Sequence, residues 1–159
     1  MLRQCLEIPE NMPSESEKKE KILNFIKFCE FGVVSTLDPG SLTPESAVVA
    51  ISQTDNLEII FASFSGTRKN HNLEKNKNVS IVIGWDNANK TTVQLEGVAH
   101  LLKGDERALL AERHCIKNPE SRKYLHDSRQ HYFKIIPRWI RYSNFSVNPQ
   151  EVWELGANS

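Results

Sequence analysis

The segment FASFSGTRKNHNLEKNKNVSIVIGW, residues 61–85, joins two apolar runs through a polar insert that carries two adjacent basic residues. The run that leads into it predicts a strand over 57–64, and the turn formers Ser, Gly and Thr at 65–67 end that strand. A short helix opens at the basic pair, and a second strand follows over 79–85. The segment therefore predicts a strand, a helix with a cationic start, and another strand.

A helix start beside a basic pair predicts an anion site. The first N–H groups of a helix have no intrahelical acceptor and lie at the positive end of its dipole. Thr67 is a candidate N-cap and hydroxyl donor, and Arg68 and Lys69 add two cationic side chains. The alternative is a solvated turn with incidental charges, because Ser, Gly and Thr are ordinary turn formers.

The remaining chain predicts a single mainly β domain with flanking helices. Its strand-like runs number about six and are separated by polar turns or short helices: 31–37, 46–52, 57–64, 79–85, 91–102 and 132–142. Helical patterns flank them at 15–30, 104–115 and 118–126, with Leu109, Leu110 and Ile116 expected on the inner face of the second helix. Short connections favour antiparallel pairing in a barrel or sheet.

Two residues inside predicted strands indicate irregular pairing. Gly97 lies within the run 91–102, where a glycine often marks a bulge or a sharp bend. Pro137 lies within the last run and cannot donate to a ladder, so we expect it at a sheet edge or a bulge.

Length and charge limit the domain organisation and the partners. The 159 residues suit one domain, 1–159, preceded by an extended arm at 1–14 that contains Pro9 and Pro13. Twenty basic and twenty acidic residues cancel, so net charge favours neither a nucleic-acid partner nor a membrane surface. We expect a small-molecule partner.

The cysteines and the hydropathy pattern indicate the cellular setting. Cys5, Cys29 and Cys115 match no metal spacing and no disulfide framework, which favours a reducing cytoplasm. No signal peptide is evident, and no apolar run approaches the roughly 20 residues that span a bilayer. We predict a soluble cytoplasmic protein, and the scattered histidines predict no metal site.

The segment 61–85 resembles, without a gap, the signature of the pyridoxamine 5'-phosphate oxidase-like flavoproteins. In that family a strand end is followed by Ser/Thr-Arg-Lys, a short helix, a turn and a strand that ends in tryptophan. The matching positions are Phe61, Ser63, Thr67, Arg68, Lys69, Asn76, Val79, Ser80 and Trp85. The resemblance implies an antiparallel split β-barrel that forms a homodimer, binds FMN at the subunit interface and contacts the FMN phosphate through Arg68 and Lys69.

The resemblance also implies other FMN neighbours. Ala47 and Ser52 stand where the oxidases of vitamin B6 have an arginine and a lysine, so backbone contacts are expected there in place of side-chain contacts. The implied set beyond the phosphate site is Ala47, Val48, Ser52, Ala62, Ser63, Thr92 and Trp153, with Gln94 as an alternative to Thr92. Trp153 lies in a segment similar to one whose tryptophan reaches the partner's flavin, and a core aromatic is its alternative role.

The implied activity is an FMN-dependent oxidoreductase that acts on an unidentified small molecule by hydride transfer through the flavin. The substrate-gripping arginine and histidine of the B6 oxidases have no counterpart here, so the chain looks closer to the short general-stress-protein-like members. The alternative is a non-catalytic protein of the same fold that binds or senses flavin, haem or a deazaflavin. We assign no catalytic residue.

Overall fold

The computed structural model describes residues 12–86 and 88–156. Most of the predicted extended arm, residues 1–11, lies outside the described residues. The helices are α1 (Glu15–Phe28), α2 (Arg68–Lys75) and α3 (Gly104–Lys117), followed by a 3₁₀ turn η1 (Pro119–Tyr124). The strands are β1 (Phe31–Leu37), β2 (Pro44–Gln53), β3 (Ile59–Phe64), β4 (Asn78–Gly84), β5 (Thr91–Leu101), β6 (Gln130–Asn144) and β7 (Glu151–Leu155).

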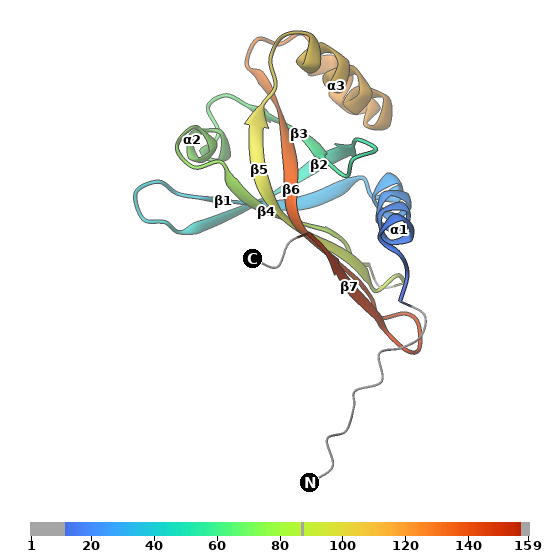
Figure 1. The fold of residues 1–159 in the computed structure, drawn as a ribbon. Helices are drawn as coiled ribbons and strands as arrows, with labels where there is room; N and C mark the ends of the chain where they lie inside the picture. Colours follow the sequence, from blue (N-terminus) through green and yellow to red (C-terminus); the bar gives the residue numbers. More distant parts are fainter. Residues whose placement is uncertain (1–11, 87, 157–159) are drawn as a thin grey trace.

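The strands form one antiparallel sheet that closes into a barrel (Figure 1). Their order is β3-β2-β1-β4-β5-β6-β7, and a further pairing between β3 and β6 closes the six-stranded barrel. The predicted mainly β class with flanking helices and about six strands is therefore confirmed. The short strand β7 was not predicted; it pairs with β6 outside the closed barrel.

A β-bulge lies where Gly97 and Pro137 meet. Glu96 pairs with Trp139 and Gly97 pairs with Pro137, so Arg138 is the extra residue on β6. A Cβ atom on Gly97 would lie 2.3 Å from the carbonyl oxygen of Ile136, which explains why glycine is required. Both predictions of irregular pairing are confirmed, and the bulge bends the two longest strands as closure of a small barrel requires.

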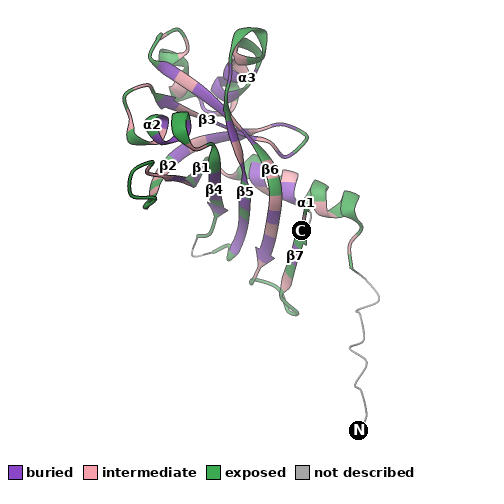
Figure 2. Ribbon diagram, turned by 60° about the vertical axis from the view of Figure 1, so that its left-hand side comes forward, coloured by how far each residue is buried: buried purple, intermediate pink, exposed green. Residues whose placement is uncertain are grey.

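Strand alternation directs one set of side chains into the barrel, and Figure 2 shows buried and exposed residues along the strands. Strand β4, for example, alternates between exposed and buried positions along its whole length, with Ile81 and Ile83 in the core. Helix α1 contributes Ile22 and Ile26 to the same cluster. This helix begins with a capping box, in which Ser14 Oγ accepts from the Glu17 amide and the Glu17 carboxylate accepts from the Ser14 amide.

Helix α3 covers β2 and β3 with a different face from the one predicted. Leu110 is buried as expected, and Ala111, His114 and Cys115 are buried beside it. The inward placement of Leu109 and Ile116 is wrong, because each side chain is 70% exposed. The inner stripe contains a histidine, which periodicity of apolar residues alone does not reveal.

Candidate functional site

Helix α2 starts at the end of β3, at a turn fixed by Thr67. The Thr67 hydroxyl donates to the Phe64 carbonyl (3.0 Å) and contacts Ser63 Oγ (2.8 Å). Thr67 occupies the predicted N-cap position, but its side chain makes no capping bond to the helix amides. The first-turn N–H groups of α2 are therefore left without a side-chain cap, so they can bind an anion at the positive end of the helix.

A cavity of about 180 Å³ lies beside this helix start. Its walls come from the ends of β1 and β2 and from the first residues at α2: Thr36, Glu45, Ser46, Ala47, Thr67, Arg68 and Lys69. We call it the phosphate cavity, after the anion expected there from the sequence. It brings together four of the predicted site residues from two separate stretches of sequence, namely Ala47, Thr67, Arg68 and Lys69.

Glu45 lines the phosphate cavity and was missed by sequence reasoning. Its Oε1 accepts from Arg68 Nη1 at 2.7 Å, and its Oε2 accepts from the Asn72 side-chain amide at 2.9 Å. Asn72 is 1% exposed and also contacts Thr36 Oγ1, so the carboxylate is held in place. Glu45 stands in a strand, far from the basic pair in sequence, and nothing in the local pattern predicts this contact.

The two basic side chains occupy different environments. The Arg68 side chain is 82% exposed although it forms an ion pair with Glu45. An exposed ion pair contributes little free energy, so Arg68 can reorient toward a ligand at a small cost in free energy. Lys69 is half-buried, and this burial lowers the pKa of its ammonium group. With Glu45 ionised, the three side chains carry a net charge of about +1, less than the basic pair alone would give.

Three further predicted residues lie around this region without lining the cavity. Val48 follows Ala47 on β2 and its side chain is 68% exposed. Ser63 is buried, and its hydroxyl contacts the Thr67 hydroxyl. Ala62 is partly buried against the small core cluster under α3. Of these, Ser63 alone has a bond to a residue of the cavity.

The structure does not bring Ser52, Thr92 or Trp153 to the phosphate cavity. Ser52 is 2% exposed, and its hydroxyl contacts His114 Nδ1 at 3.0 Å beneath α3. Thr92 is buried and pairs with Gly84, at the end of β4 remote from Ser80. Trp153 is 6% exposed in the main core and stacks on Tyr142 with ring centroids 4.6 Å apart, which agrees with its alternative role as a core aromatic.

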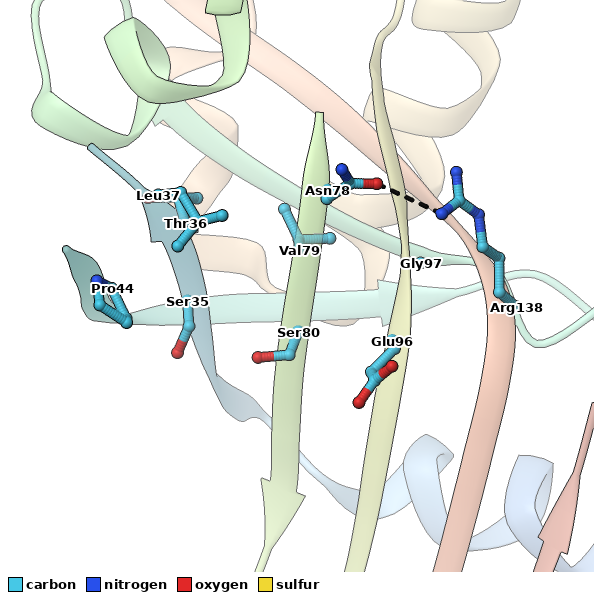
Figure 3. A pocket seen from close by; sticks show the side chains of 10 residues that line it. All are labelled: Ser35, Thr36, Leu37, Pro44, Asn78, Val79, Ser80, Glu96, Gly97 and Arg138. Atoms are coloured by element: carbon cyan, nitrogen blue, oxygen red, sulfur yellow. Dashed lines mark hydrogen bonds between the residues drawn. The ribbon is translucent and has the colours of Figure 1, made fainter. Parts of the chain in front are cut away.

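A second cavity adjoins the first and shares Thr36 with it. Its volume is about 360 Å³, and its polar residues include Ser35, Ser80, Glu96 and Arg138. Figure 3 shows Ser35, Ser80 and Glu96 on three neighbouring strands, with Arg138 donating to the Asn78 side chain at 3.3 Å. We call it the Arg138 cavity. Arg138 is the bulged residue of β6, and strand pairing brings it to this cavity.

Strand register extends this polar surface into an apolar one. Ser46, Ser35, Ser80 and Glu96 are neighbours across β2, β1, β4 and β5. Two residues along each strand, on the same face, the neighbours are Val48, Val33 and Val82, which are 68%, 40% and 43% exposed. We call these three residues the valine row. The valine row is thus an exposed apolar stretch of the sheet surface across three strands.

Neither a cluster of metal ligands nor a helix suited to span a membrane lies within residues 12–86 and 88–156. There, no three histidine, cysteine, aspartate or glutamate side chains lie close enough together to hold a metal ion. Likewise, no helix in these ranges combines the length and the apolar character needed to cross a bilayer.

Comparison with known proteins gives a family and a fold. Residues 19–144 match the family model described as pyridoxamine 5'-phosphate oxidase. No significant match was found among curated proteins.

Several solved structures share the fold at low sequence identity. General Stress Protein 26 from Bacillus anthracis str. Sterne has a TM-score of 0.68 and 24% identity, over 87% of this chain and 98% of that one. A heme binding protein from Mycobacterium smegmatis has a TM-score of 0.78 and 18% identity, over 92% and 59%. A protein related to general stress protein 26 from Clostridium acetobutylicum has a TM-score of 0.67 and 11% identity, over 89% and 97%. These identities establish a shared fold alone.

Proposed function

The chain belongs to the pyridoxamine 5'-phosphate oxidase-like split-barrel family, and from this premise we propose that it is an FMN-dependent oxidoreductase acting on a small molecule. The observation that carries the proposal is the phosphate cavity, where Thr67, Arg68 and Lys69 meet the uncapped first turn of α2.

The residues of the phosphate cavity fit a phosphate monoester. The uncapped amides of α2 supply donors, Lys69 supplies a partly desolvated charge, and Arg68 supplies a mobile guanidinium. Glu45 opposes phosphate binding, since its carboxylate would repel the phosphate. The repulsion is reduced if the ion pair between Arg68 and Glu45 persists when the phosphate binds. Phosphate, Glu45 and the two basic residues would then form a compact network close to electroneutrality.

The rest of the FMN would extend along the outer surface of the sheet. Ala47 and Val48 continue from the phosphate cavity along β2, and Ser35, Ser80 and Glu96 line the neighbouring Arg138 cavity. The valine row, next to these residues, is the surface we assign to a homodimer with FMN at the subunit interface. Ser52, Thr92 and Trp153 are buried within the subunit, so the proposed contacts do not include their side chains.

The chemistry divides between cofactor and protein. When bound, FMN supplies the hydride transfer. The chain binds the phosphate, restricts the orientation of the ring and excludes water where the partner subunit covers the site. Arg138 and Glu96 offer one charge of each sign for orienting a small polar substrate. No side chain is assigned as a general acid or base.

Titration of the purified protein with FMN, followed by flavin fluorescence, tests the proposal. The variant with Arg68→Ala and Lys69→Ala should bind FMN roughly a hundredfold more weakly or worse, because charge-assisted hydrogen bonds contribute about 1.5–3 kcal/mol each. Lys75→Ala, in the last turn of the same helix, is the matched control and should bind normally. Unchanged affinity in a folded double variant would show that the anion site lies elsewhere.

A second candidate function is non-catalytic binding of flavin, haem or a deazaflavin on the same fold. It is motivated by the structural likeness to the mycobacterial heme binding protein and by the lack of an assigned acid or base. The visible spectrum after addition of FMN or haem separates the cofactors. Turnover with NADPH as the electron donor supports the oxidoreductase, whereas tight binding without turnover on any donor favours the binding protein.

We also propose a cytoplasmic setting. Both described cysteines are free thiols, with Cys115 buried and Cys29 half-buried. Reduced thiols are the ordinary state in a reducing compartment. Fractionation of cells that express the tagged protein tests this assignment.

A further inference from the structure

A third cavity lies further along α2 and shares no residue with the phosphate cavity or the Arg138 cavity. It has a volume of about 290 Å³ and is lined by residues of α2, of the end of β5 and of the start of β6. Figure 1 shows the arrangement of these three elements. Asn70 and Leu73 line it from α2, Lys77 and Lys103 from the loops beside it, and His131 and Phe133 from β6. We call it the His131 cavity.

The hydrogen bonds of Asn70 determine which nitrogen of the His131 ring carries a proton. Asn70 is 4% exposed, and its Nδ2 donates to the Phe64 carbonyl (2.8 Å) and to Thr67 Oγ1 (3.2 Å). A carbonyl can only accept, so the Oδ1 atom of Asn70 must be the one that faces His131 Nδ1 at 2.7 Å. Nδ1 of His131 therefore carries a proton, and in the neutral ring Nε2 is an acceptor.

The rest of the cavity combines two lysines, Lys77 and Lys103, with an apolar wall. Neither Lys77 nor Lys103 forms an ion pair with a described residue, while Glu74 is the one carboxylate in the lining. Leu73 and Phe133 are 3% and 5% exposed and form a largely apolar wall. A ligand that suits these features carries an anionic group for the lysines, a flat or apolar body, and a hydroxyl that donates to His131 Nε2.

We propose that the His131 cavity is a second ligand site, separate from the phosphate cavity, that binds a small hydroxylated carboxylate. The carboxylate lies between Lys77 and Lys103, the body packs on Leu73 and Phe133, and the hydroxyl donates to His131. The volume suits a compact ligand, since it lies at the low end of the range for small-molecule pockets.

A chain of hydrogen bonds connects this site with the start of α2. His131 contacts Asn70, Asn70 contacts Thr67, and Thr67 contacts Ser63. Thr67 lines the phosphate cavity, so this chain of hydrogen bonds ends at residues of the other site. The two sites are separate in their lining but share this polar connection.

The test is a titration of the ligand-free, isotopically labelled chain with 4-hydroxybenzoate, followed by the amide resonances. We expect saturable shifts at residues 70–77, 99–103 and 131–133, with a dissociation constant on the order of 1 mM or tighter for so small a ligand. Benzoate, which lacks the hydroxyl, should bind severalfold more weakly. No saturation by roughly 10 mM, or shifts centred on Arg68 and Lys69, would overturn the proposal.

Variants locate the binding without depending on the buried polar residues. The double variant Lys77→Met and Lys103→Met changes exposed side chains and should weaken 4-hydroxybenzoate at least about tenfold. Lys75→Met is the matched control and should change nothing. Equal affinity in the double variant and the wild type would contradict the proposal, and because FMN is absent, this result does not depend on the proposed function.

Discussion

Glu45 is the residue that most changes the expected chemistry of the site. The sequence indicates a basic anion site, and the structure adds a carboxylate that accepts from Arg68 and from the buried amide of Asn72. An anion that enters must share Arg68 with this carboxylate. Glu45 therefore reduces the net positive charge of the site to about +1 and lowers its affinity for highly charged anions.

The change Glu45→Gln tests this competition directly. Glutamine keeps the shape and can still accept from Asn72, but it no longer neutralises Arg68. FMN should bind about threefold to tenfold more tightly, since a like-charge repulsion is removed from a partly exposed site. Isothermal titration calorimetry measures the change, and Glu112→Gln on α3, which also loses an arginine partner, serves as the control. Weaker binding in Glu45→Gln would mean that the carboxylate helps to position Arg68.

His114 links the stability of the fold to pH. Burial, together with the smaller effect of the nearby Lys117 charge, lowers the pKa of the ring to about 4. In the unfolded chain the ring has its ordinary pKa of about 6.5, so the unfolded state binds more protons between these two values. Stability is therefore complete near neutral pH and is lost as the pH falls from about 6.5 toward 4.

Urea unfolding at several pH values between 4 and 7 should show this loss. The wild type should lose about 3 kcal/mol of unfolding free energy across the window from this group alone, as an upper value. His114→Gln should be less stable at pH 7 but should show a shallower dependence on pH. Parallel curves for the two proteins would mean that His114 does not titrate on unfolding.

At the scale of single elements, the β5–β6 bulge has no room for a side chain at Gly97. The change Gly97→Ala would place a Cβ atom 2.3 Å from a carbonyl oxygen of β6, so the two longest strands must separate locally. We expect a loss of about 2–4 kcal/mol in unfolding free energy. Gly66→Ala is the matched control, because no atom lies within 4 Å of its added Cβ. Thermal denaturation compares the two, and equal midpoints would contradict the close approach.

Sequence patterns predicted most elements but not the contacts between them. Strand runs, the bulge at Gly97 and the start of α2 follow from local chemistry, and each was found where predicted. Strand β7 was missed because a strand of five residues is too short to show a clear alternation of apolar and polar residues. Glu45 and Arg138 were missed because strand register brings them to the site, and register depends on the folded sheet.

At the scale of the whole molecule, the valine row is the surface on which the proposed homodimer depends. The change Val33→Glu places a charge at the middle of the row and should convert the dimer to a monomer in sedimentation experiments, with FMN binding weakened in parallel. Ile116→Glu, at an equally apolar and more exposed position on α3, is the control and should remain dimeric. A Val33→Glu protein that stays dimeric would place the interface on another face.

Closure of the barrel by β3 and β6 has a consequence for synthesis of the chain. Strand β3 ends at Phe64 and its partner β6 begins only at Gln130, so the strands between them leave the ribosome first. Until β6 emerges, β3 and β5 each present an unpaired edge, and the growing polypeptide is a curved open sheet. A nascent chain that stalls within α3 should therefore need a chaperone to remain free of aggregates, whereas one released after Asn144 can close the barrel and protect both edges.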